Sequence, residues 1–388
     1  MKLEEFKVYC DFVRLLTSFA AQALLQKAQT VVHKYTYQAS KNPRNVVRLA
    51  QTLPSGYRVV LLEKHSHFNH AFALPRNAVF SGRESRAFIP YDNIAAGAPN
   101  GIFQRVCDEA LDVTDKHIKL GSGHDLSYDY LVLATGAAQP PPARLLSQDR
   151  TDAISELQGF QQRISDAERI AVVGGGAVGV ELISEIRDKY PDKYPDKYPD
   201  KKLSLLHSRD QLLPRFGSKL HEWVMPALRE KNIEVLMGER PSLPSRAGEA
   251  VRETTLTLAS GETKTWDLVN DEIIVKPTLQ VDHLPSSRGN IFAIGDVAQT
   301  GGPKQGRAGL MQAEVAVSNI VRLVKNRANL KEYKPSYFEG SLTLTLGKDL
   351  TLMYMQKGSF EWVVKRNGHD PDVGAGKRWQ QLHAKAAS

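Results

Sequence analysis

The fold is decided by residues 170–186, IAVVGGGAVGVELISEI, where four apolar residues lead into a glycine cluster and a helical pattern follows. Gly174, Gly176 and Gly179 have the G-x-G-x-x-G spacing of a dinucleotide phosphate loop. The first glycine of such a loop permits a tight turn, the second lets the backbone approach a pyrophosphate, and the third lets helix pack on strand. The helix N-terminus then faces the phosphates with unpaired N–H groups. The stretch predicts a pyridine-nucleotide site rather than a purely structural turn.

The strand after this loop bears on the choice of cofactor. NAD-specific enzymes place an Asp or Glu at the end of this strand, where it binds the ribose 2′-hydroxyl. Here the expected strand, residues 203–207, ends in His207 and is followed by Ser208 and Arg209, so it offers no carboxylate. A nearby arginine accommodates the 2′-phosphate of NADP instead. We therefore predict that Arg209 binds this phosphate and that NADPH is preferred, with NADH tolerated.

Three further segments indicate a second dinucleotide, FAD. Glu63 ends an apolar strand, YRVVLLE, where a carboxylate can bind the hydroxyls of an adenosine ribose. Residues 128–136, YDYLVLATG, run as a strand into a turn at Gly136. Residues 290–296, NIFAIGD, end in Asp296, which can accept a hydrogen bond from a ribityl hydroxyl. A glycine-rich loop and a helix follow, and the N-terminus of that helix can stabilise negative charge on a reduced flavin.

Short apolar strands alternate with helical segments along most of the chain, which is typical of βαβ units on a parallel sheet. The clearest expected strands are residues 57–63, 118–120, 130–134, 170–173, 203–207 and 291–294. The pattern predicts an α/β protein with two three-layer, Rossmann-like dinucleotide-binding domains and a small C-terminal α+β domain. Residues 41–150 and 268–330 would form an interrupted FAD-binding domain, residues 151–267 an NAD(P)-binding domain, and residues 331–388 the C-terminal domain, with a hairpin at residues 342–354.

Several of these segments together resemble a known family. The runs at residues 134–136, 174–181 and 291–296 are similar to the flavoprotein superfamily of pyridine nucleotide-disulfide oxidoreductases. Within it, residues 63–76, EKHSHFNHAFALPR, and residues 295–314, GDVAQTGGPKQGRAGLMQAE, resemble the apoptosis-inducing-factor-like branch that includes the ferroptosis-suppressor oxidoreductases. The resemblance covers nearly everything after residue 44. It implies hydride transfer from NAD(P)H to FAD, followed by electron delivery to a quinone or a similar small-molecule acceptor.

The resemblance also implies roles for individual residues. Glu181 would contact the nicotinamide end of the cofactor, although a glutamate in the first turn also suits the helix dipole. Lys304 is the candidate catalytic residue, because an ammonium near the flavin would stabilise negative charge on it; the alternative is an exposed loop lysine. By matching positions, FAD binding is carried over to Glu63, Arg76, Gly136, Asp296 and Lys304, and NAD(P) binding to Gly174, Gly176, Gly179 and Glu181.

Two departures from the family pattern fall in the expected FAD-binding domain. The family begins with a strand, a glycine loop and a helix that hold the FAD pyrophosphate, but here Val46 and Val47 pass straight into Arg48. Residues 271–275 likewise join residues 276–281 without the expected Thr-Gly turn. Loss of the phosphate loop removes the glycines and the helix terminus that offset the pyrophosphate charge. FAD affinity is expected to fall severely unless a neighbouring segment compensates.

Composition excludes several other classes of function. The 51 basic and 43 acidic residues give a net charge of +8, but they are interspersed, so no nucleic-acid partner is expected. Cys10 and Cys107 form no dithiol, which favours a reducing compartment such as the cytoplasm. Residues 1–40 contain an amphipathic helical pattern whose residues 12–32 either lie on a membrane surface, mitochondrial membranes included, or dock on the protein itself. His65 and His67 lack accompanying ligands, so no metal site is expected.

These patterns leave two rivals to a flavoenzyme. The first is a flavin-deficient NAD(P)H-binding module that derives from such an enzyme and acts through partners. The second is a membrane-peripheral scaffold whose N-terminal segment is the working part. The lost phosphate loop favours the first rival, and the sequence supports the second least.

Overall fold

The computed structural model describes residues 49–96, 98–137, 139–192, 201–239, 254–257, 263–266, 273–282, 289–368 and 370–384. The predicted N-terminal helix and the junction at Val46 and Val47 lie outside these residues. Strands and helices alternate through most of the described chain, and the α/β class with Rossmann-like units is confirmed. Within the described residues, no helix is both long enough and apolar enough to cross a membrane.

A three-stranded parallel sheet forms around the glycine loop. Its strands are β9 (Arg169–Val173), β10 (Lys202–His207) and β11 (Glu234–Met237), and its helices are α3 (Arg150–Asp166), α4 (Ala177–Lys189) and α5 (Ser218–Glu230). The strand order is β11-β10-β9, and neighbouring strands are parallel. They are parallel because α4 and α5 each carry the chain back to the end of the sheet at which the previous strand began. Two βαβ units result, as the sequence predicts.

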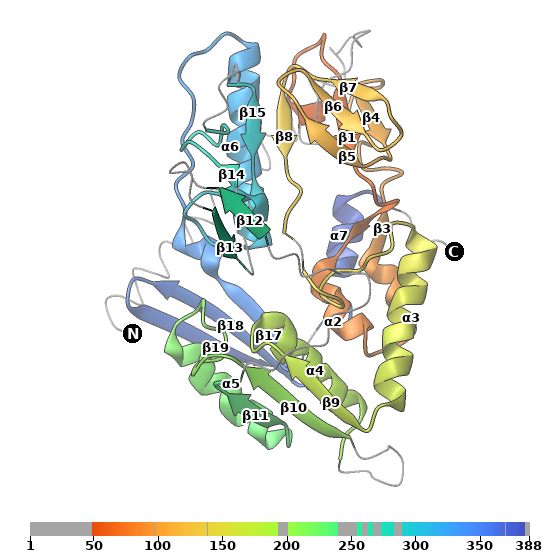
Figure 1. The fold of residues 1–388 in the computed structure, drawn as a ribbon, viewed down its shortest axis with the longest axis vertical. Coiled ribbons are helices and arrows are strands. Elements are labelled where there is room, and N and C mark those ends of the chain that lie inside the picture. The colour runs from red at the N-terminus through yellow and green to blue at the C-terminus, as the bar shows by residue number, and fades with distance from the viewer. Residues whose placement is uncertain are drawn as a thin grey trace.

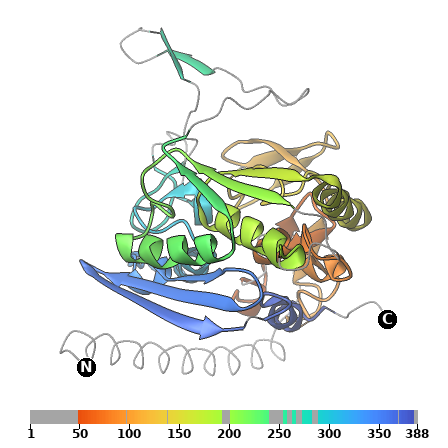
Figure 2. The same cartoon turned by 90° about the horizontal axis from the view of Figure 1, so that it is seen from below.

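A second, antiparallel sheet packs against α4 and α5, on the side away from the parallel sheet. It contains β17 (Leu342–Thr345), β18 (Leu350–Lys357) and β19 (Phe360–Asn367). The predicted hairpin is confirmed, since Leu342 pairs with Tyr354 and Leu344 with Leu352. Figure 2 shows α4 and α5 lying between the parallel and antiparallel sheets. Apolar side chains from both sheets and both helices share one core, in which Ile183, Leu205 and Leu344 are fully buried. The layering fixes the glycine loop beside the C-terminal sheet.

Two separate strand pairs stand where a continuous flavin-type sheet is expected (Figure 1). One pair is β1 (Val59–Leu62) with β4 (Phe103–Val106), and the other is β8 (Leu131–Leu133) with β15 (Ile291–Ala293). Both pairs are parallel and share apolar clusters, yet no strand among the described residues joins them by hydrogen bonds. This is the arrangement that loss of a central strand would leave.

The remaining elements surround these layers. They are η1 (Leu49–Gln51), β2 (His67–Asn69), η2 (Ala71–Ala73), α2 (Leu74–Asn77), η3 (Glu84–Ala87), β3 (Phe88–Pro90), β5 (Ala110–Val113), β6 (His117–Leu120), β7 (Asp125–Ser127), β12 (Thr254–Thr257), β13 (Thr263–Trp266), β14 (Ile273–Ile274), η4 (Gly295–Val297), β16 (Ala298–Gln299), α6 (Gly306–Val324), η5 (Tyr337–Gly340) and α7 (Ala375–Gln381). Helix α6 runs beside β15, and its first residue follows the loop that carries Lys304.

Candidate functional site: a cleft between the glycine loop and helix α6

The glycine loop has the geometry that its motif predicts. Gly174 has φ +118°, a conformation that side chains rarely adopt, and its N–H donates to the Leu206 carbonyl over 2.8 Å. Gly176 is the last residue before α4. A Cβ on Gly179 would lie 2.0 Å from the Gly174 carbonyl oxygen, so only glycine lets the helix lie this close to the turn. The backbone is therefore shaped to accept a phosphate at the start of α4.

A cleft of about 1060 Å³ opens in front of this loop. Its walls come from five parts of the chain: residues 71–72, the glycine loop, residues 207–209 with 213–216, the loop that precedes α6, and the segment from Pro335 to the C-terminal sheet. Of the predicted site residues, the cleft brings together Gly174, Gly176, Arg209, Asp296 and Lys304. Arg215 adds a third cationic side chain, and Asp296 is the one carboxylate among the described residues that line the cleft. The balance favours an anionic ligand.

The wall opposite the glycine loop positions Lys304 and Asp296. The Lys304 ammonium donates to the carbonyl oxygens of Ala298 over 2.6 Å and of Asp296 over 3.2 Å. Gly295, at φ +76°, turns the chain after β15, and its N–H donates to the buried side chain of Gln312 over 2.7 Å. Helix α6 begins two residues after Lys304, so its N-terminal dipole and the ammonium act on the same part of the cleft.

Arg209 and His207 differ in how they face the cleft. Arg209 is exposed and is one of the residues that line the cleft. His207 is buried, and its Nδ1 accepts a hydrogen bond from the Gly175 N–H over 3.1 Å. The sequence shows His207 only as the end of a strand, so its contact with the glycine loop was not predicted.

Glu63 and Gly136 lie at the ends of the two separate strand pairs, outside the residues that line this cleft. Burial acts to raise the pKa of Glu63, but hydrogen bonds from the side chain and backbone of His65 outweigh it, and the net shift is downward. Its Oε1 lies 2.7 Å from His65 Nδ1 and 2.9 Å from the backbone nitrogen of the same residue. Gly136 has φ +72° in the turn after β8. Their FAD-binding roles stay predictions.

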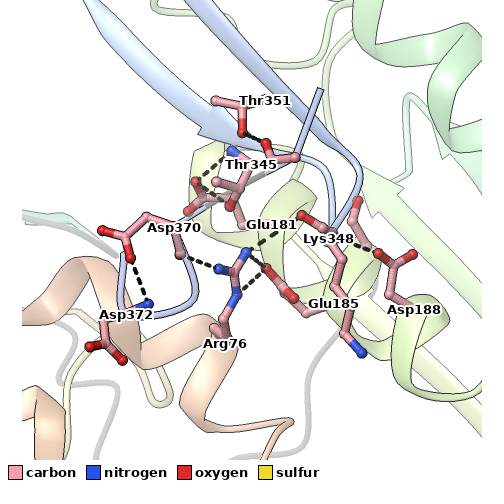
Figure 3. A network of polar contacts seen from close by, with 12 residues as sticks. Arg76, Glu181, Glu185, Asp188, Thr345, Lys348, Thr351, Asp370 and Asp372 are labelled. Carbon is pink, nitrogen blue, oxygen red and sulfur yellow. Dashed lines mark hydrogen bonds and ion pairs between the residues drawn. The ribbon is translucent and has the colours of Figure 1, made fainter. Parts of the chain in front are cut away.

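Arg76 and Glu181 belong to a polar network away from the cleft lining (Figure 3). Arg76, on α2, is buried, and its guanidinium forms an ion pair with Glu185 of α4, with Nε 2.8 Å from Oε1. It also donates to the carbonyl oxygen of Asp370 over 2.9 Å. Glu181 Oε1 accepts from the backbone N–H of Thr345 over 3.1 Å. The structure places both side chains in contacts with protein, and their cofactor roles stay predictions.

Burial raises the pKa of Glu181 to about 7. The nearby carboxylate of Glu185 also acts to raise it, while hydrogen bonds from Thr345 and the charge of Arg76 act to lower it. The carboxyl group of Glu181 therefore changes its charge near neutral pH, in the layer between α4 and the antiparallel sheet.

Phe72 is the cleft residue that sequence reasoning missed most clearly. It lines the opening, yet its side chain is 62 % exposed. Its ring makes an edge contact with His70 at 5.7 Å between centroids and lies close to Gly306 at the start of α6. A large exposed aromatic side chain in a cleft offers a flat apolar surface for a ligand. No pattern around residues 68–76 distinguishes Phe72 from a core residue.

The fold and the glycine loop together define an α/β nucleotide-binding protein. The family model described as pyridine nucleotide-disulphide oxidoreductase matches residues 45–319. The chain belongs to this family. The predicted resemblance, the assignment as an oxidoreductase, and FAD and a nicotinamide nucleotide as its cofactors are thereby confirmed.

Relatives and solved structures agree with this membership. The chain is 32% identical over 377 residues to Fe-regulated protein 8 of Mycosarcoma maydis, which covers 87% of this chain and 91% of the relative. It is 30% identical over 319 residues to ferroptosis suppressor protein 1 of Mus musculus, covering 74% and 79% of the two chains. The fold is similar to that of the sulfide:quinone oxidoreductase of Aquifex aeolicus, with a TM-score of 0.59, 15% identity and 84% of each chain covered.

The two cofactors fit the described residues unequally. The nicotinamide nucleotide has the glycine loop, where Gly176 lines the cleft with open space beside it, and the N-terminus of α4 directly behind that loop. A flavin ring finds Asp296, Lys304 and the start of α6 on the opposite wall. For the FAD pyrophosphate, the described residues contain no second glycine loop between the two strand pairs. The flavin end fits better than the adenosine end.

Proposed function

We propose that this protein is an FAD-dependent NAD(P)H oxidoreductase that passes electrons from NADPH, or less readily from NADH, to a quinone-like small-molecule acceptor. One observation carries the proposal: a single cleft is bounded by the glycine loop of α4 on one side and by Asp296, Lys304 and the start of α6 on the other. Hydride transfer requires the nicotinamide and the flavin to meet face to face within contact distance. A cleft with one nucleotide-binding element on each wall supports that arrangement.

The bound flavin would supply the redox chemistry, and the side chains of this protein orient and tune it. Lys304, held by two backbone carbonyls, places an ammonium where negative charge would develop on the flavin. The Asp296 carboxylate on the same wall would accept a hydrogen bond from a ribityl hydroxyl of the flavin. Arg209 faces solvent at the end of β10, where the 2′-phosphate of NADPH would lie, and Arg215 adds positive charge nearby. These roles follow from charge and position in the cleft.

The acceptor in this proposal is a quinone or a similar flat, apolar molecule. A relative at 30% identity is named ferroptosis suppressor protein 1, and a fold neighbour is a sulfide:quinone oxidoreductase. The exposed ring of Phe72 in the cleft is compatible with a planar acceptor. We further propose a cytoplasmic enzyme that attaches peripherally to a membrane through residues 12–32, which lie outside the described residues.

One observation favours a second candidate, a flavin-deficient NAD(P)H-binding module. The strand pairs β1–β4 and β8–β15 are not joined by any described strand, and the FAD phosphate loop is missing from the sequence. FAD in this family is held in part by such a loop, so its loss would weaken flavin binding. The glycine loop of α4 is intact in either case, and both candidates bind NADPH.

The visible absorption spectrum of the purified protein, followed by anaerobic titration with NADPH, tests the proposal. A flavin band that bleaches on titration and recovers on addition of a soluble quinone would support the oxidoreductase. A colourless protein that takes up no added FAD, yet binds NADPH, would favour the flavin-deficient module. Gly179→Ala is the matched control, because it should abolish the NADPH response without touching the flavin wall.

A further inference from the structure

The middle glycine of the loop, Gly175, is not required by the G-x-G-x-x-G spacing, yet both its N–H and its carbonyl form hydrogen bonds. Its N–H donates to His207 Nδ1 over 3.1 Å, and its carbonyl accepts from the Leu213 N–H over 2.8 Å. His207 Nε2 in turn lies 3.0 Å from the carbonyl oxygen of Gln211. The segment after β10 therefore holds the glycine loop through both backbone polar groups of one residue, Gly175.

These two contacts define the tautomer of His207. A backbone N–H can only donate, so Nδ1 must be an acceptor without a proton. A carbonyl oxygen can only accept, so Nε2 must carry the proton. A doubly protonated ring, or the opposite tautomer, would place an N–H against the Gly175 N–H. The loop contact therefore needs a neutral imidazole in one orientation.

The atoms around the hydrogen bond between Gly175 and His207 leave no room for a side chain on Gly175. A Cβ on Gly175 would lie 2.8 Å from His207 Cγ and 2.4 Å from Leu212 Cδ2, so a side chain at this position would displace the ring. Leu213 is buried and has φ +55°, a left-handed conformation that costs a non-glycine residue about 1 kcal/mol or more. Its N–H reaches the Gly175 carbonyl from that conformation. The strained Leu213 and the extra glycine, Gly175, are thus partners in the same hydrogen bond between the segment after β10 and the glycine loop.

We propose that His207 is a positioning residue for the nicotinamide nucleotide: its neutral imidazole holds the glycine loop in the conformation that receives the pyrophosphate. The Gly175 N–H is used by the ring, which leaves the phosphates to Gly176, Ala177 and the first turn of α4. This inference rests on the proposed binding of NADPH by this loop.

Two substitutions separate the hydrogen bond from the bulk of the ring. In His207→Asn, the side-chain oxygen can take the place of Nδ1 and accept from Gly175, whereas His207→Leu offers no acceptor. We expect His207→Leu to raise the KM for NADPH about tenfold, the effect of losing one buried hydrogen bond, with kcat changed much less. His207→Asn should stay within about threefold of wild type. Equal KM values for Leu and wild type, or an Asn variant that behaves like Leu, would overturn the proposal.

His221→Leu is the matched control. His221 Nδ1 accepts from the Leu212 N–H over 3.0 Å, which is the same kind of contact on the same segment, but it does not touch the glycine loop. Its KM for NADPH should stay within about threefold of wild type. A tenfold rise in this control would mean that the whole segment matters and His207 has no particular role.

Amide hydrogen exchange of the wild-type protein without nucleotide provides a readout that no variant can spoil by failing to fold. The Gly175 amide should exchange far more slowly than the Gly176 amide, because only the former is hydrogen-bonded to His207. Equal, fast exchange would refute the contact. If the wild type does not bind NADPH, the proposed function fails, whereas the Gly175 protection still decides whether His207 holds the loop.

Discussion

Replacing Glu181 by glutamine should make the protein more stable at neutral and alkaline pH and leave it unchanged at acid pH. The pKa of this carboxyl is raised from 4.5 to about 7, first by burial. Glutamine keeps an oxygen that can accept from Thr345 but cannot ionise. The variant therefore removes the cost of placing a negative charge in the layer between α4 and the antiparallel sheet.

The magnitude follows from the two pKa values. Below pH 4.5 the carboxyl is protonated in both folded and unfolded chains, so wild type and variant should have similar stability. Between pH 4.5 and about 7 the unfolded chain ionises while the folded one keeps its proton, and the wild type loses stability as the pH rises. At 1.36 kcal/mol per unit, the full loss is about 3 kcal/mol at most, and it is complete above pH 7.

Urea unfolding of wild type and Glu181→Gln at pH 5, 6, 7 and 8 measures this difference. The stability of the variant relative to wild type should grow across the series, while Glu222→Gln, an exposed change on α5, should follow the wild type. Parallel curves at every pH would refute the reasoning. A raised KM for NADPH with no gain in stability would instead place Glu181 at the nicotinamide, as the family resemblance implies.

Three substitutions test other contacts. In Gly179→Ala the new methyl would meet a backbone oxygen at 2.0 Å, so NADPH affinity measured by titration should fall at least 100-fold, about 3 kcal/mol; Gly159→Ala, in the interior of α3, should leave affinity unchanged. Arg76→Met removes the ion pair with the buried Glu185 and should lower the unfolding free energy by about 3 to 5 kcal/mol. The double variant Arg76→Met with Glu185→Leu should regain most of this loss, and a double variant as unstable as the single one would contradict the reasoning. Arg209→Ser should raise the KM for NADPH about tenfold and leave that for NADH within twofold, and equal effects on both would remove Arg209 from cofactor selection.

The unit β9–α4–β10 could be predicted from sequence because every local signal agrees there. An apolar strand, a glycine turn and a helical pattern follow one another within residues 170–186, and the expected strand ends differ by only one residue from those of the structure. Strand β19 was not predicted. Its Trp362 is half exposed although it is apolar, and Val363 and Val364 follow it directly, so polar and apolar residues do not alternate along this strand.

The candidate site, like the fold, has a part that could be predicted from the sequence and a part that could not. Gly174 and Arg209 follow the neighbouring parallel strands β9 and β10, whose carboxyl ends meet at one edge of a sheet, so their meeting in the cleft could be predicted. Asp296 follows β15 of a separate strand pair, and only the packed structure brings it to the opposite wall of the cleft. Arg76 and Glu181 could not be placed from local pattern. Their partners lie 109 and 164 residues further along the chain, and only the packed structure brings these groups together.

The ion pair between Arg76 and Glu185 fixes one end of helix α4 to α2. Glu185 is near the C-terminal end of the helix, whereas the glycine loop is at its N-terminal end, about 13 Å away at 1.5 Å per residue. Any rotation of α4 relative to α2 must turn about the pinned end, and a rotation of about 5° would carry the phosphate loop roughly 1 Å. A displacement of that size can change a hydride-transfer rate about 100-fold. In the proposed enzyme, a contact outside the cleft would thus limit how precisely the two nucleotides are aligned within it.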